Sequence, residues 1–149
     1  MGNHHKLSVA NLTPLASLRV TRQLIPAHNL LPNTSLQSKP LLHYHSAFPS
    51  SYGTPQIQTH LKDVGVVTPQ WTYSMYPFTH YHSSSHEVLS IASGSALCCF
   101  GGEDNKDRYE ALLEKGDVVV VPAGVGHRLL EEKERPFVVS MDAEQCVVC

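Results

Sequence analysis

The fold of this chain is decided by one stretch, His80-Tyr81-His82-Ser83-Ser84-Ser85-His86-Glu87, which continues through residues 88–93 to Gly94. Side chains alternate between the two faces of an extended backbone, so two histidines separated by one residue point to the same side. Glu87 opens an apolar run that predicts the next strand, and the serine link can fold its carboxylate back towards the histidines. Two imidazoles and one carboxylate that converge suit a first-row transition metal and leave coordination positions open.

A second stretch contains turn-forming residues on both sides of an apolar run: Gly116-Asp117-Val118-Val119-Val120-Val121-Pro122-Ala123-Gly124-Val125-Gly126-His127. The pattern predicts a turn, a strand of four valines, and a second turn built on proline and glycine. It ends on one histidine, which begins another predicted strand. A further histidine is thus placed directly after a tight turn.

Together the two stretches resemble the paired motifs of the cupin superfamily. The first motif is His-x-His, a carboxylate five residues after the second histidine, and a glycine seven residues later. The second motif is Gly, five residues, Pro-x-Gly, two residues and His. Every position is filled, and residues 70–141 are similar to the small single-domain YjlB-like cupins, with a weaker similarity from residue 40. The resemblance implies an all-β fold, a small antiparallel β-barrel of the cupin or jelly-roll type.

The resemblance also implies a metal centre. Its ligands would be His80, His82, Glu87 and His127, around one divalent transition metal. Three neutral imidazoles and one carboxylate leave such an ion with a net charge of about +1, and a six-coordinate ion keeps two adjacent positions free. Iron is the expected metal, and manganese, nickel, zinc or cobalt would accept the same ligands.

Three other histidines need an interpretation. His86 stands beside Glu87, so on a regular strand it faces outward, but its place at a loop–strand junction makes it a candidate catalytic acid or base. His43 and His45 repeat the His-Tyr-His pattern after Leu41 and Leu42. No carboxylate or glycine follows them at motif spacing, so we expect them not to bind metal.

A chain of 149 residues indicates one domain. We expect an N-terminal extension over residues 1–40, a single cupin barrel over 41–145 and a short tail over 146–149. The extension contains four prolines and is expected to be mostly irregular, so a chain lacking residues 1–38 should stay folded and metal-bound. One helix is predicted over residues 54–65, with Thr54 as N-cap and Gly65 as its end. The predicted strands are Trp71–Met75, Phe78–His82, Val88–Ile91, Ala96–Phe100, Glu110–Leu113, Val118–Val121, Arg128–Leu130 and Phe137–Met141.

The charge and the apolar pattern exclude several classes of protein. No apolar run is long enough to cross a bilayer, and the acidic barrel half has no basic stripe that would indicate nucleic-acid binding. Residues 1–62 contain no Asp or Glu. They could therefore include an organelle transit peptide, although a solvated extension of a cytoplasmic protein is the favoured interpretation. Cys98, Cys99, Cys146 and Cys149 do not form a disulfide pattern, and the adjacent pair is expected to face opposite sides of a strand.

Two classes of function remain open. The first is a metal-dependent enzyme acting on a small organic acid, phenol or ketone. Dioxygenase-like, oxygen-dependent chemistry is favoured, and a redox-neutral decarboxylase, lyase or isomerase that uses the metal as a Lewis acid is the alternative. The second class is a non-catalytic barrel that binds or senses a small molecule. The resemblance further implies a homodimer, and no substrate-binding residue can be assigned from the pattern.

Overall fold

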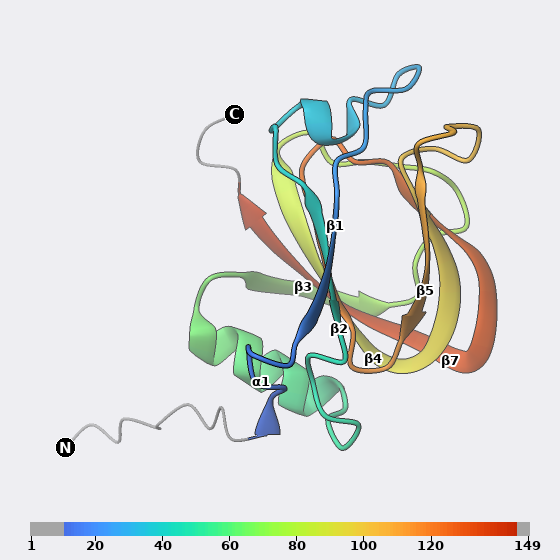
Figure 1. The fold of residues 1–149 in the computed structure, drawn as a ribbon. Helices are drawn as coiled ribbons and strands as arrows, with labels where there is room; N and C mark the ends of the chain where they lie inside the picture. Colours follow the sequence, from blue (N-terminus) through green and yellow to red (C-terminus); the bar gives the residue numbers. More distant parts are fainter. Residues whose placement is uncertain (1–10, 146–149) are drawn as a thin grey trace.

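The computed structural model describes residues 11–145, except for the side chains of Pro69, Glu144 and Gln145. Its elements, in chain order, are β1 (Arg19–Gln23), the 3-10 turn η2 (Asn33–Ser35), β2 (Leu41–His45), α1 (Thr54–Val64), β3 (Thr68–Tyr73), β4 (Ser85–Phe100), β5 (Tyr109–Glu114), β6 (Val118–Val121) and β7 (His127–Gln145). All paired strands are antiparallel. Figure 1 shows the strands curling around a common interior, with α1 outside them. The expected all-β barrel with one short helix is confirmed for the described residues.

The sheet follows the order β1-β2-β6-β4-β7-β3, with β5 paired to β4 beside this path. β4 is long and belongs to two walls of the barrel. Its first half pairs with β6, where Glu87 lies opposite Val121, and its second half pairs with β5, where Phe100 lies opposite Tyr109. β7 accompanies β4 through both halves, with register shifts around Ser93 and Ser95. The predicted strands on either side of Gly94 are therefore one continuous bent strand (Figure 1).

The core fills the space between these walls. On β5 and β6 buried residues alternate with less buried ones, as the pattern of two predicts, whereas β4 has runs of consecutive buried residues. The largest fully buried apolar side chains are Ile25, Leu41, Ile57, Leu89, Ile91, Phe100, Leu113, Val119, Val125 and Val139. All of these except Ile57 belong to one cluster inside the barrel. Ile57 instead anchors α1 on the outside, against Phe48 and Ala92.

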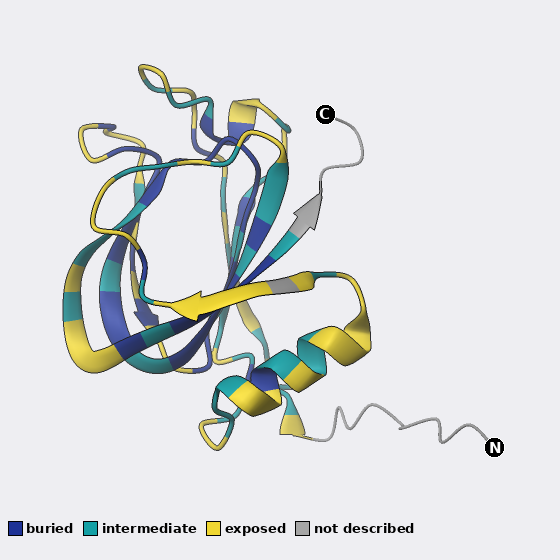
Figure 2. Ribbon diagram, turned by 180° about the vertical axis from the view of Figure 1, so that it is seen from behind, coloured by how far each residue is buried: buried dark blue, intermediate teal, exposed yellow. Residues whose placement is uncertain are grey.

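The helix begins and ends close to where the sequence predicts. Gly53, not Thr54, is the N-cap residue, and its N–H donates to the side-chain oxygen of Gln56 at 2.9 Å. Gly65 closes the helix in the left-handed conformation, with φ at 74°. Only part of the apolar surface of the helix is buried, because Ile57 is completely buried whereas Val64 is 43% exposed. The outer side of α1 faces solvent (Figure 2).

The N-terminal segment is part of the barrel, which corrects the boundary expected at residue 40. β1 pairs with β2 along its whole length, and Ile25 is completely buried in the barrel cluster. The buried Asn33 amide donates to the carbonyl oxygens of Pro26 and Gly101, and its oxygen accepts the N–H of Gly126. A chain lacking residues 1–38 would therefore lose β1 and the core residue Ile25, which argues against the expectation that it stays folded. Of the segment 1–40, in which a transit peptide was considered, residues 1–10 lie outside the described residues.

Two of the four cysteines lie within the described residues. Cys98 and Cys99 are free thiols and both are buried, but only Cys98 belongs to the cluster inside the barrel, as the expected opposite facing of the pair requires. Burial raises the pKa of Cys98 to about 12 and that of Cys99 to about 11, which makes both thiols unreactive. Cys146 and Cys149 lie outside the described residues. Over residues 11–145, none of the helical segments has the length and apolar character to cross a bilayer.

Candidate metal centre

The four predicted ligands come from three places in the chain. His80 and His82 lie on the segment between β3 and β4, which is not the regular strand predicted over residues 78–82. His80 instead makes an isolated two-way bridge with His127, at 3.2 Å and 2.9 Å between backbone N and O atoms. Glu87 projects from β4. The backbones of two of the predicted ligands are thus held directly against each other.

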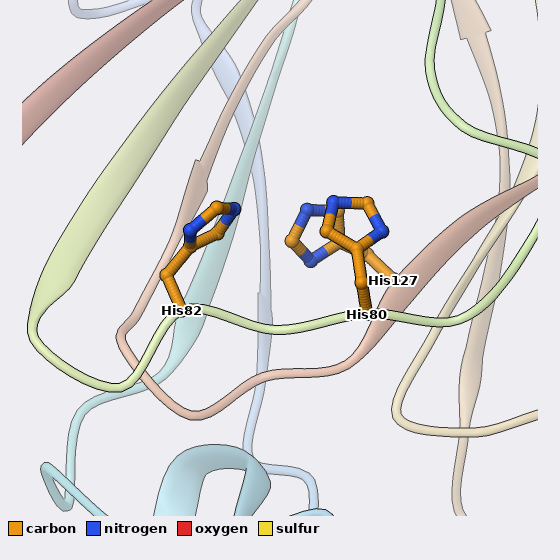
Figure 3. A group of neighbouring side chains, drawn as sticks. All are labelled: His80, His82 and His127. Atoms are coloured by element: carbon orange, nitrogen blue, oxygen red, sulfur yellow. The ribbon is translucent and has the colours of Figure 1, made fainter.

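The structure brings these side chains together. One ring nitrogen from each of His80, His82 and His127 lies within 4.8 Å of the others, and Figure 3 shows the three rings on one side of the segment that carries His80 and His82. The Glu87 carboxylate joins them, with Oε1 3.0 Å from His82 Nε2 and Oε2 2.9 Å from His127 Nε2. The Glu87 carboxylate therefore lies beside two of the three imidazoles.

The hydrogen bonds behind two of the imidazoles fix which nitrogen is free. His127 Nδ1 lies 2.9 Å from the carbonyl oxygen of Val125, and His80 Nδ1 lies 3.2 Å from that of Phe78. A carbonyl oxygen only accepts, so each Nδ1 carries the proton and each neutral ring keeps a lone pair on Nε2. Such backbone partners commonly orient histidine ligands of metal ions.

The contact between His127 and Glu87 bears directly on metal binding. The lone pair of His127 Nε2 faces Glu87 Oε2, a buried oxygen with no hydrogen-bond donor among the described residues. Two acceptors only 2.9 Å apart repel unless a proton or a cation lies beside both. A divalent ion shared by the imidazoles and the carboxylate would satisfy the orphaned oxygen, so the residues present fit the implied metal.

The electrostatics of the site keep the carboxylate ionised. Burial alone would raise the pKa of Glu87, but the His127 and His82 imidazoles, whenever they carry a proton on the nitrogen that faces its oxygens, hold that pKa far below its usual range. The hydrogen bond to Glu87 raises the pKa of His82, whereas burial and the nearby His127 lower that of His80. The site thus combines one permanent negative charge with a set of basic nitrogens, as a cation site requires.

A cavity of about 210 Å³ opens beside the ligands. It is lined by the four ligands and by Trp71, Met75, Tyr76, Leu89 and Met141. Sequence reasoning missed the aromatic and methionine walls, because Pro77 obscures the alternation that would tell which way Trp71 and Tyr76 face. The missing signal is the register of β3 on β7, which places Trp71 opposite Met141. The indole N–H of Trp71 donates to the sulfur of Met141.

His86 does not lie in this cavity, which corrects its candidate role as a catalytic acid or base at the metal. It faces the other side of β4, where its Nδ1 accepts the N–H of Ala123 at 2.9 Å. There it lines a separate surface groove with Arg22 and Lys39. The strand alternation that turns Glu87 inward turns its neighbour outward, so the sheet separates His86 from the reacting centre.

The second His-Tyr-His pattern also belongs to a cluster. His43, His45 and Asp117 each offer an atom within 4.8 Å of the others. Every one of these atoms has a partner, however. His43 contacts Tyr109 Oη and Asp117 Oδ2, both at 2.9 Å, and His45 contacts Arg19 and Thr21. The sequence did not indicate the carboxylate, because Asp117 reaches His43 from the turn before β6.

Comparison with known proteins agrees with this fold and site. Residues 59–142, more than half of the chain, match the family described as Cupin. Uncharacterized protein YjlB of Bacillus subtilis (strain 168) is 39% identical over 82 residues, which are 49% of this chain and 48% of that protein. Auxin-binding protein ABP20 of Prunus persica is 40% identical over 60 residues, which are 40% of this chain and 27% of that protein. The chain thus spans less than half the length of these relatives.

Solved structures are similar at a lower level. RmlC from Streptococcus suis, in complex with dTDP-D-xylose, is 14% identical, with a TM-score of 0.41 over 85% of this chain and 70% of that one. The plu4264 protein from Photorhabdus luminescens is 12% identical, with a TM-score of 0.37 over 97% of this chain and 88% of that one. These similarities are too low to indicate a function. The family match, the two filled motifs and the gathered ligands establish that the chain belongs to the cupin family.

Proposed function

We propose that this protein is a metal-dependent enzyme with dioxygenase-like, oxygen-dependent activity on a small organic substrate. The observation that carries the proposal is the orphaned Glu87 Oε2, which faces the bare Nε2 of His127 inside an apolar cavity. A divalent metal held by His80, His82, Glu87 and His127 would supply Lewis-acid activation of an oxygen-bearing substrate and, as iron, electron transfer to dioxygen.

The residues of the chain contribute binding and exclusion of water. Val125 and Phe78 hold two imidazoles in the orientation that aims Nε2 at the centre. The apolar walls made by Met75, Leu89 and Met141 lower the local dielectric, which strengthens every charge interaction inside. The carboxylate of Glu87 offsets part of the charge of the ion and leaves a centre with affinity for an anionic oxygen.

A redox-neutral decarboxylase, lyase or isomerase is less well supported by the geometry. Such chemistry needs a proton donor or acceptor besides the metal ligands. His86 was the candidate, and it faces the opposite side of the sheet. Of the described residues that line the cavity, only Tyr76 adds a titratable group to the four ligands.

A non-catalytic, small-molecule-binding barrel is the second candidate. The observation that favours it is the name of the peach relative, an auxin-binding protein, although this chain spans only 27% of that protein.

The cytoplasmic location and the homodimer expected from the sequence also stay proposals. Light scattering coupled to size exclusion would test the dimer.

Elemental analysis tests the proposed metal centre. The protein is purified without added metal and without a nickel column, beside His127→Ala and the control His60→Ala on the outside of α1. About one equivalent of iron in the wild type and the control, lost in His127→Ala, supports the oxygen-dependent enzyme. Stoichiometric manganese, nickel or zinc would favour the redox-neutral alternative. A protein that stays metal-free after reconstitution would leave only the binding barrel.

A further inference from the structure

A groove on the surface shares two lining residues with the metal cavity. This groove has a volume of about 360 Å³ and is lined by Trp71, Thr72, Tyr73 and Tyr76. Trp71 and Tyr76 line the metal cavity as well, so the two hollows share walls. The groove lies along β3, the exposed edge strand of the sheet (Figure 2). Trp71 and Tyr76 therefore border both the exposed groove and the cavity that holds the candidate metal ligands.

The aromatic rings around the cavity and the groove contact one another. Tyr76 stacks on Phe78 with 5.1 Å between ring centroids, and its edge-on contact with the ligand His80 is 5.3 Å. Tyr73 lies 6.2 Å from Tyr76. Trp71, Tyr73 and Tyr76 are nevertheless 46%, 60% and 40% exposed. Aromatic rings that gather in an exposed patch beside a cavity offer flat faces to a ligand, and Tyr and Trp suit a place that is half apolar and half wet.

The charge of the two hollows limits what can enter. Glu87 is the only acidic residue among their lining residues, which include no Lys or Arg. A ligand anion would thus meet positive charge only at the metal centre, whose net charge is about +1. One negative charge can be matched there, whereas a second would be buried without a partner, at a large cost in free energy. Ligands that place two negative charges inside the inner cavity do not fit this site.

The volumes of the cavity and the groove indicate which part of a ligand would lie in each. An apolar cavity of about 150 Å³ is filled by one benzene molecule. The inner cavity of about 210 Å³ must also hold the metal and the oxygen atoms of its other ligands. A ring attached to a metal-binding oxygen group would therefore extend between the shared walls and into the groove.

We propose that this protein takes an aryl substrate with one neutral or singly charged oxygen head group, whose ring lies against Trp71 and Tyr76. Aryl carboxylates are the simplest members of this class. The position of the head group rests on the proposed metal centre. The contact of the ring with the two side chains does not, so the two ideas can fail separately.

The chain contains a single tryptophan, so intrinsic fluorescence reports directly on Trp71. The protein is loaded with zinc, which is redox-inactive, and titrated with benzoate, with cyclohexanecarboxylate of equal charge, and with the dianion phthalate. Benzoate should give a saturable change in emission. Its affinity should exceed that of cyclohexanecarboxylate by about three- to tenfold, the gain expected from one aromatic contact. Phthalate should bind more weakly than benzoate.

Two variants and one control locate the ring. Tyr76→Leu should weaken benzoate binding by about three- to tenfold and abolish most of its preference over cyclohexanecarboxylate. Tyr73→Leu, at the most exposed ring, should weaken it less and serves as the test if Tyr76→Leu does not fold. Tyr81→Leu is the matched control, because Tyr81 is also 40% exposed but lines neither hollow. Its affinity for benzoate should equal that of the wild type.

Several results would overturn the proposal. Equal affinity for benzoate and cyclohexanecarboxylate would remove the aromatic preference, and tight binding of phthalate would contradict the limit of one charge. If the wild type binds metal and His127→Ala loses it, but the wild type does not bind benzoate, the substrate class is contradicted and the proposed metal centre is not. Unchanged benzoate affinity after removal of the metal would contradict the position of the head group. A change in Trp71 emission that follows dimerisation without any probe would show that a second copy fills the groove.

Discussion

His43 Nε2 lies 2.9 Å from Asp117 Oδ2, and these two side chains are only 1% and 3% exposed. Asp117 also accepts the backbone N–H groups of Ser46 and Glu114, at 2.9 Å and 3.1 Å. The other ring nitrogen of His43 contacts the hydroxyl of Tyr109, from β5 in the opposite wall. This network therefore ties β2, β5 and the turn before β6 together inside the barrel.

Asp117→Ala should destabilise the protein by about 3 kcal/mol, because it leaves His43 and two N–H groups without their buried acceptor. Burial opposes ionisation of Asp117, but the hydrogen bond from His43 and those from the two N–H groups hold its pKa below the ordinary value. A lowered pKa in the folded state contributes stability above the unfolded pKa, and that contribution is lost as the pH falls. Urea unfolding at pH 7 and below pH 4 should thus show a difference that narrows in acid. A constant difference would show that the carboxylate does not act through its charge.

The double variant His43→Ala with His45→Ala should keep its full metal content. The hydrogen bonds of both rings serve the fold, and Arg19 places a positive charge 2.9 Å from His45 Nδ1, which opposes a cation there. Elemental analysis of the folded fraction measures the effect, with His127→Ala as the comparison. Loss of metal in the double variant would show that this second cluster is the site that binds it.

The two histidine patterns show what the sequence could and could not predict. The candidate ligands His80, His82 and Glu87 were readable from the motif spacing, although residues 78–82 do not form the regular strand that was expected to align the two histidines. Asp117 could not be assigned to His43, because the contact depends on the pairing of β2 with β6, which joins residues far apart in the chain. The inward position of Ile25 was hidden for the same reason, since β1 reaches the barrel only by pairing with β2.

Glu87→Gln should weaken metal binding and leave the barrel folded. The amide keeps the shape of the side chain but removes the negative charge and offers one oxygen where the carboxylate offered two. Isothermal titration with zinc should show a loss of affinity of about tenfold or more, while circular dichroism stays that of the wild type. Unchanged affinity would assign the carboxylate role to another residue.

Gly94→Ala should destabilise the barrel far more than Gly65→Ala. The two glycines have similar positive φ angles, 70° and 74°, so the conformational strain of an added Cβ is matched. At Gly94 that Cβ would meet the carbonyl oxygens of Glu134 and Pro136, the latter at 2.5 Å, whereas at Gly65 nothing lies within 4 Å. We expect about 1 kcal/mol for Gly65→Ala and several kcal/mol for Gly94→Ala. Thermal unfolding checks this, and equal losses would mean that β4 can move away from β7 at the bend.

Asp142→Asn should stabilise the protein at neutral pH. Asp142 is 1% exposed on β7, and neither of its oxygens has a hydrogen-bond partner among the described residues; the nearby hydroxyls of Ser90 and Ser140 are likewise unpaired. Burial raises the pKa of Asp142 to about 6. A carboxyl group whose folded pKa exceeds its unfolded value costs nothing while both states are protonated, and its cost grows as the pH rises through that interval. The wild type should therefore lose stability between about pH 4 and pH 6, and the variant should not.

The gain from Asp142→Asn should be on the order of 1–2 kcal/mol at pH 7.5 and close to zero at pH 4. Urea unfolding at both values measures it, with Asp63→Asn on the exposed side of α1 as the control that should show little change. A loss of stability at pH 7.5 would mean that the buried carboxylate accepts hydrogen bonds that the amide cannot replace, in which case the hydroxyls of Ser90 and Ser140 would be the first donors to test. A gain that appears equally at both pH values would instead assign the benefit to the amide hydrogen bonds, because only the charge of the carboxylate changes over that interval.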